Sequence, residues 1–185
     1  MKITRRQLRN LISEQTFGTS NPVIKRYFYS EKPYAGFRDT EQISRRGFNP
    51  KPRGLWYACG DDWREWVKYE MPHWYEAYNH LYEVTINPKH ILFITNADQF
   101  KAFEKEFGLS GGAEPMFFDG EAGIDWVRVS MKYAGIEICP YQSQFRMSSN
   151  WYYPWDVASG CIWYSEGVVS VTEVPFDTDM HGQSY

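Results

Sequence analysis

The sequence predicts a mixed α+β fold with one or more strongly twisted sheets flanked by helices. Short β-branched and aromatic runs are interleaved with helical periodicities, without the regular strand–helix–strand rhythm of a parallel α/β protein. Aromatic residues make up 18% of the 185 residues, enough to fill the core of a small sheet or to stack on planar ligands. We expect residues 23–174 to form a single globular domain.

The segment Lys51–Tyr69 is the part around which we expect the fold to be organised. Gly54–Ala58 is short, apolar and aromatic, as a buried strand should be. The turn Cys59–Asp62 then offers a glycine and two carboxylates that can begin a helix. Trp63, Trp66 and Val67 follow at helical spacing and predict one inward-facing apolar stripe, which serves either core packing or a ligand.

The remaining elements follow from similar patterns. Strands are predicted at Val23–Ser30, Leu81–Ile86, Ile91–Thr95, Ile136–Tyr141, Gly160–Trp163 and Val168–Val174. Helices are predicted at Asp39–Arg46, at Asn96–Phe107 and after Asp125, the last with Ile124, Val127 and Met131 on one face. We expect residues 175–185 to be a flexible tail.

The first fourteen residues form a separate unit with its own signals. Thr4 and Gln7 make a capping box, and Leu8, Leu11 and Ile12 form the stripe of a basic amphipathic helix. Residues 15–22 are linker-like, rich in Gly, Ser, Thr and Asn. The unit resembles the capsid-targeting helices of tailed phages, which a prohead protease cuts after Leu or Ile, any residue, then Glu. The motif ending at Glu14 fits this pattern, although an ordinary docking helix fits the same residues.

Composition and charge exclude several classes of function. The net charge of −3 gives no global attraction to nucleic acid. The three cysteines lack zinc spacing and the four histidines form no cluster, so we expect three reduced thiols and no metal site. No apolar run is long enough to span a membrane. Phosphate-loop, Rossmann, serine-hydrolase and zinc-protease motifs are all absent from the sequence.

Three pieces remain where chemistry can occur. The first is the polar end of the first strand, with Arg26, Tyr29 and Ser30. The second is the turn and strand Gly54–Tyr57. The third is Asp156, which lies between Trp155 and Val157 just before a late strand. A carboxylate in such aromatic surroundings needs either hydrogen-bond partners, such as the Ala158–Ser159 backbone, or a function that repays its burial.

Together these pieces resemble the ADP-ribosyltransferase-like superfamily. Members begin with a strand ending in a His-x-Thr-like or Arg-containing motif, continue with a glycine–aliphatic–aromatic–aromatic–small segment, and carry a carboxylate near the start of a late strand. Tyr27–Ser30, Gly54–Ala58 and Asp156 match these places, with Phe28 where many members have His and Asp156 where Glu is usual. From Tyr27 to Trp163 the chain is also similar to a group of uncharacterised phage proteins with HYS, KPxGLWY and WYYxWDxASGCIW blocks.

The resemblance implies a phage enzyme that transfers ADP-ribose from NAD to a host protein or nucleic acid, working in the virion interior or the host cytoplasm. Asp156 would be its catalytic carboxylate, stabilising the charge on the ribose. The residues that would bind NAD are Arg26, Tyr29, Ser30, Gly54, Leu55, Trp56, Tyr57 and Arg146. Trp56 or Tyr57 would stack on the nicotinamide, and Arg26 or Arg146 would pair with the pyrophosphate.

Two further interpretations remain open. On the same fold, the chain can be a non-catalytic binding module or a virion-internal structural protein, with its aromatic blocks serving as core. Aromatic residues in a groove also favour single-stranded nucleic acid binding, but once the basic N-terminal helix is set aside the rest of the chain is distinctly acidic, which opposes it.

Overall fold

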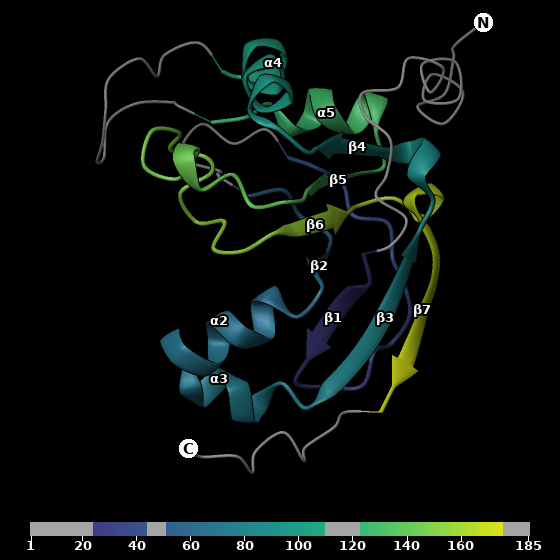
Figure 1. The fold of residues 1–185 in the computed structure, drawn as a ribbon. Coiled ribbons are helices and arrows are strands. Elements are labelled where there is room, and N and C mark those ends of the chain that lie inside the picture. The colour runs from purple at the N-terminus through teal and green to yellow at the C-terminus, as the bar shows by residue number, and fades with distance from the viewer. Residues whose placement is uncertain (1–23, 44–50, 110–122, 176–185) are drawn as a thin grey trace, which may run out of the picture.

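The computed structural model describes residues 24–43, 51–109 and 123–175, which form an α+β fold around one curled, seven-stranded mixed sheet (Figure 1). The expected α+β class is therefore confirmed. The N-terminal helix, the linker and nearly all of the expected tail lie outside the described residues.

The sheet has the strand order β4-β5-β6-β2-β1-β3-β7. The strands are β1 (Arg26–Ser30), β2 (Leu55–Cys59), β3 (His80–Ile86), β4 (Ile91–Ile94), β5 (Gly135–Ile138), β6 (Ser159–Ile162) and β7 (Val168–Val174). Only β4 and β5 pair in parallel, and every other neighbouring pair is antiparallel. All seven predicted strands are present, with ends shifted by a few residues.

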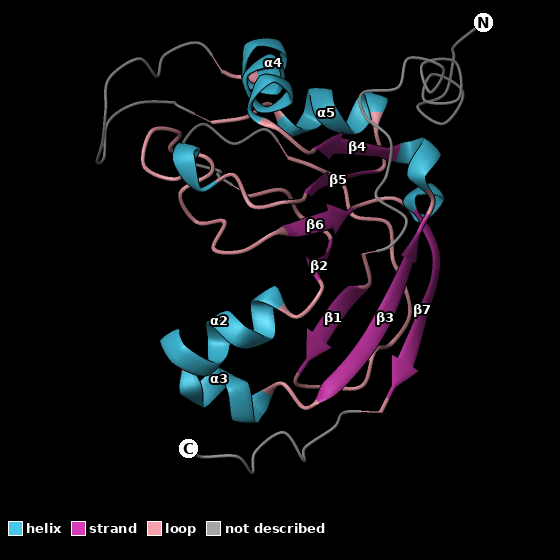
Figure 2. Cartoon of the chain, in the orientation of Figure 1, coloured by secondary structure: helices cyan, strands magenta, loops and turns pink. Residues whose placement is uncertain are grey.

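The helices form two groups on different parts of the sheet (Figure 2). α4 (Ala97–Phe107) and α5 (Trp126–Lys132) lie beside β4 and β5, whereas α2 (Asp62–Glu70) and α3 (Pro72–Ala77) lie beside β1, an interior strand of the sheet. Asn96 and Asp125 begin α4 and α5 by accepting hydrogen bonds from the backbone N–H groups of Gln99 and Arg128.

Both faces of the β4–β6 half of the sheet are buried. Along β4, Leu92 and Ile94 belong to a large cluster with residues of α4 and α5, whereas Ile91 and Phe93 belong to a smaller cluster on the other face. The large cluster also contains Trp151, Trp155 and Trp163. This two-sided burial explains why β4 reads as a continuous apolar run rather than an alternating one.

Three local predictions were wrong. Residues 39–43 are not helical, although a helix was expected from Asp39. α3 was missed, because Pro72 ends one helical pattern and, at a first helical position, begins another. In α5 the buried side chains are Trp126, Val129 and Ser130, not the face that contains Met131.

Candidate functional site

A pocket of about 550 Å³ lies between the β2 region of the sheet and the α2–α3 pair. It brings together six of the predicted site residues: Tyr29, Gly54, Leu55, Trp56, Tyr57 and Asp156. These residues come from three places in the sequence, and the pairing of β2 with both β1 and β6 places them side by side.

Gly54 lines this pocket, and its backbone conformation and surroundings require a glycine. Its φ is +153°, and a Cβ there would lie 2.2 Å from the carbonyl oxygen of Ile162 in β6. No other residue fits such a close approach of two strands. The glycine at the start of the predicted motif therefore allows β2 to enter the sheet beside β6.

One wall of the pocket is aromatic. Trp63 of α2 stacks on Tyr29 of β1 with ring centroids 4.9 Å apart, and meets Tyr78 edge-on at 5.1 Å. Trp66 and Trp74 line the same pocket. Val67 is the one buried residue of α2. Core packing and a ligand site were both open for the tryptophan stripe, and Trp63 and Trp66 line the pocket.

The Tyr29 hydroxyl is buried and has no hydrogen-bond partner within the described residues, and burial raises the pKa of Tyr29. Orphaned buried hydroxyl groups are unusual, and one that belongs to a pocket-lining residue is a candidate partner for a ligand.

The other end of the pocket is polar. The carboxylate of Asp156 accepts a hydrogen bond from the Arg146 guanidinium at 2.9 Å, rather than binding the Ala158–Ser159 backbone. The Lys51 ammonium lies 5.0 Å from the centre of the Trp56 ring. Burial raises the pKa of Asp156, although the charges of Lys51 and Arg146 oppose that rise. Burial lowers the pKa of Lys51, and the charge of Asp156 opposes it.

Three predicted binding residues do not line the pocket. Ser30 bonds through its hydroxyl to the backbone of Lys32, in the turn after β1. Arg146 reaches the site only through Asp156. Arg26 is buried and directs its guanidinium to Glu137 at 2.5 and 3.0 Å and to the carbonyl of Ile24.

Glu137 is the centre of a buried network that sequence reasoning missed. It is 2% exposed, and besides Arg26 it accepts a hydrogen bond of 2.9 Å from the Tyr57 hydroxyl. Tyr57 and Glu137 are separated in the sheet by Gly160 of β6, and the Tyr57 ring lies over this glycine. The available signal was a charged residue inside the otherwise apolar run of β5.

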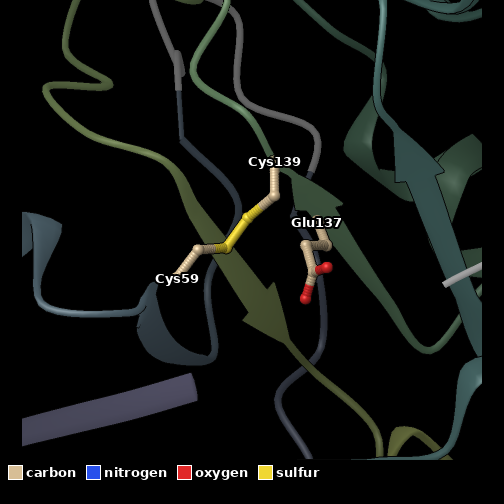
Figure 3. A group of neighbouring side chains, drawn as sticks. All are labelled: Cys59, Glu137 and Cys139. Atoms are coloured by element: carbon tan, nitrogen blue, oxygen red, sulfur yellow. A yellow bond between two sulfur atoms is a disulfide. The ribbon is translucent and has the colours of Figure 1, made fainter. Parts of the chain in front are cut away.

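Two of the three cysteines form a disulfide, so the expectation of three reduced thiols was wrong. Cys59 ends β2 and Cys139 directly follows β5, and the bond joins these two strands although β6 lies between them (Figure 3). Cys161 is free and buried. The sequence does not indicate this pairing, because the two cysteines are 80 residues apart and meet only in the folded sheet.

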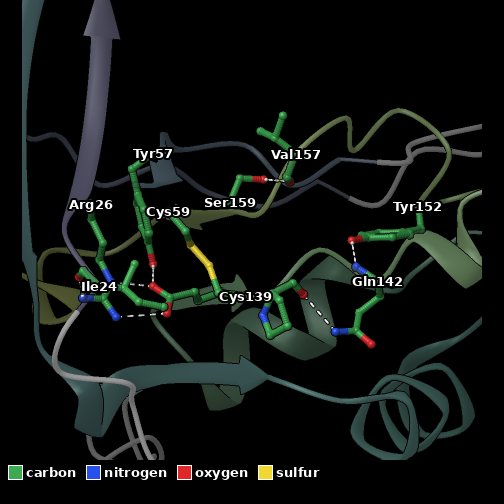
Figure 4. The surroundings of a disulfide bond; sticks show 11 residues. Ile24, Arg26, Tyr57, Cys59, Cys139, Gln142, Tyr152, Val157 and Ser159 are labelled. Atoms are coloured by element: carbon green, nitrogen blue, oxygen red, sulfur yellow. Dashed lines mark hydrogen bonds and ion pairs between the residues drawn. A yellow bond between two sulfur atoms is a disulfide. The ribbon is translucent and has the colours of Figure 1, made fainter. Parts of the chain in front are cut away.

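Glu137, Cys59 and Cys139 also form a group whose ligand atoms lie within 4.8 Å of one another, as a metal ion would require. Here each has another partner: the sulfurs bind each other, and the carboxylate binds Arg26 and Tyr57 (Figure 4). The three residues therefore contribute to a disulfide and a neighbouring ion pair at β2, the strand whose residues line the pocket.

No protein-family model, no curated protein and no solved structure matches the chain. None of the helices in the described ranges has the length and apolar character needed to cross a bilayer.

Proposed function

We propose that the chain is a mono-ADP-ribosyltransferase-like phage protein that binds NAD in the aromatic pocket and transfers its ADP-ribose to a host macromolecule. The observation that carries the proposal is the convergence of Tyr29, Gly54–Tyr57 and Asp156 on one pocket. The resemblance implies these residues from the sequence alone.

The chemistry requires the bond between nicotinamide and ribose to break, so that nicotinamide leaves as a neutral molecule. An acceptor atom then forms a bond to the same ribose carbon, and its proton passes to solvent. The ribose becomes positively charged in between, and a nearby carboxylate stabilises that charge. Asp156 is the only carboxylate among the described pocket-lining residues, and Arg146 holds it in position.

The rings of the pocket have separate roles in this proposal. Trp56 is half-buried, lines the pocket and is braced edge-on by Trp155 at 4.8 Å, so it is the better ring for stacking on nicotinamide. Tyr57 is less suited, because its hydroxyl is committed to Glu137. Arg26 is committed to the same carboxylate, so the proposal assigns it to the support of β2 and not to the pyrophosphate.

The test is nicotinamide release from NAD by the full chain, with and without host lysate. Release that is lost in Asp156→Asn and kept in Asp98→Asn, an exposed carboxylate in α4, supports the proposal. Melting temperatures of both variants must lie close to that of the parent chain. Absence of release, together with no rise of melting temperature in NAD, would refute it.

A non-catalytic binding or virion-internal structural role is the second candidate, and one observation favours it. The Asp156–Arg146 ion pair joins two parts of the connection between β5 and β6, as a purely structural carboxylate would. On that account, Asp156→Asn lowers the free energy of unfolding by about 1–3 kcal/mol through the unpaired guanidinium, and no NAD turnover exists to be lost.

A further inference from the structure

Positive charge is left over at the polar end of the pocket. Among the described residues that line it, Lys51 and Asp156 are the only charged ones. The Asp156 carboxylate is already paired with Arg146, so one carboxylate faces two cations. Counting these three groups alone, Lys51, Arg146 and Asp156 sum to one positive charge in partly buried surroundings.

Lys51 carries this surplus. None of the carboxylates in the described ranges forms an ion pair with its ammonium, which lies 5.0 Å from the centre of the Trp56 ring. Burial lowers the pKa of Lys51, which means that the folded chain holds this charge at a cost. A bound anion would offset that cost, because it favours the charged form of Lys51.

Two observations restrict the chemical class of that anion. The pocket volume of about 550 Å³ suits a ligand larger than a free inorganic ion. The aromatic wall of the pocket, which includes Trp63, Trp66 and Tyr78, offers ring surfaces suited to a planar heterocycle. A ring joined to a phosphate satisfies both, and a lysine ammonium is a common point-charge partner of phosphate.

We propose that Lys51 is the phosphate-binding residue of this pocket and that the ligand class is a nucleotide, with its ring on the aromatic wall. This inference rests on the proposed function and deepens it, because it places the phosphate contact on a residue that neither the resemblance nor the sequence pattern selected. It replaces Arg26, whose guanidinium belongs to Glu137.

The experiment compares ADP with adenosine, which share the ring and differ in the phosphates. Binding to the full chain is followed by tryptophan fluorescence at low and high salt. We expect ADP to bind about tenfold more tightly than adenosine at low salt, as one charge-assisted contact provides, and the difference to shrink in high salt.

Three variants make the test specific. Lys51→Met keeps an unbranched aliphatic side chain at this position and should remove the preference for ADP while leaving adenosine affinity within about twofold. Lys51→Arg should keep the preference, which also shows that the position tolerates change. Lys89→Met, at an exposed lysine that does not line the pocket, should behave like the parent chain.

Each contrary outcome has a distinct meaning. Equal binding of ADP and adenosine by the parent chain, or an ADP preference that survives in Lys51→Met, overturns the role of Lys51 and leaves the nucleotide pocket of the proposed function standing. Failure of ADP, adenosine and NAD to bind at all overturns both proposals.

Discussion

Replacing Gly160 with alanine should disturb the close packing of β6 against Tyr57 of β2 and the backbone of β5. An added Cβ would lie 2.3 Å from both the Cζ and hydroxyl oxygen of Tyr57, and 2.8 Å from the carbonyl oxygen of Ile136. Real Cβ atoms do not approach this closely, so either the Tyr57 ring or the strand must move. The carbonyl belongs to the neighbouring strand and cannot swing aside, so we expect the ring to move.

The magnitude follows from the two terms that this movement involves. Overpacking of a well-filled interior costs about 1–3 kcal/mol. Displacing the ring also breaks its 2.9 Å hydrogen bond to Glu137, and a bond to a charged group contributes about 1.5–3 kcal/mol. We therefore expect Gly160→Ala to lower the free energy of unfolding by about 2.5–6 kcal/mol.

Chemical denaturation of four chains measures the effect: parent, Gly160→Ala, Tyr57→Phe and the double variant. Because both single changes remove the same hydrogen bond, the double variant should lose less than their sum. Gly123→Ala is the matched control, since its Cβ would meet only a methyl of Leu109 at 3.8 Å. A Gly160→Ala cost no larger than that of the control, or costs that add fully in the double variant, would refute the reasoning.

Three other predictions concern the disulfide, the buried ion pair and Asp156. Converting Cys59 and Cys139 to serine should lower the free energy of unfolding by about 3–5 kcal/mol, because the cross-link closes a long loop, and a reductant should lower the parent's stability likewise while leaving the variant unchanged. Glu137→Ala should cost about 3–5 kcal/mol by stranding the buried Arg26 guanidinium, and Arg26→Met combined with Glu137→Leu should recover much of it in the same denaturation assay. Nicotinamide release needs ionised Asp156, whose pKa is raised, so its acid limb should fall at a pH above 3.8; an acid limb at or below that pH would contradict this.

The strands could be predicted from the sequence because their signals are local. β2 and β7 are short runs bounded by turn residues, and each appears close to its predicted range. The caps of α4 and α5 could be predicted for the same reason, since an Asn or Asp three residues before the N–H it binds is visible in one dimension.

Long-range partners carry no such signal. Nothing local indicates that Arg26 binds Glu137, 111 residues away, or that Cys59 meets Cys139. The sequence placed Tyr29, Trp56 and Asp156 in one site through a resemblance, whereas the charge balance that singles out Lys51 requires the pairing of Asp156 with Arg146 to be seen. Which of these distant residues meet depends on the order of the strands in the sheet, and local sequence patterns do not reveal that order.

The α2–α3 pair has a consequence for local opening. Val67 is the one side chain buried by α2, and α3 buries none, so little apolar contact opposes their separation from the sheet. Their amide hydrogens should therefore exchange with solvent faster than those of β5, which is buried along its whole length. Because their tryptophans line the pocket, any ligand that fills it supplies the contacts that the helices lack, and their exchange should slow as the pocket fills.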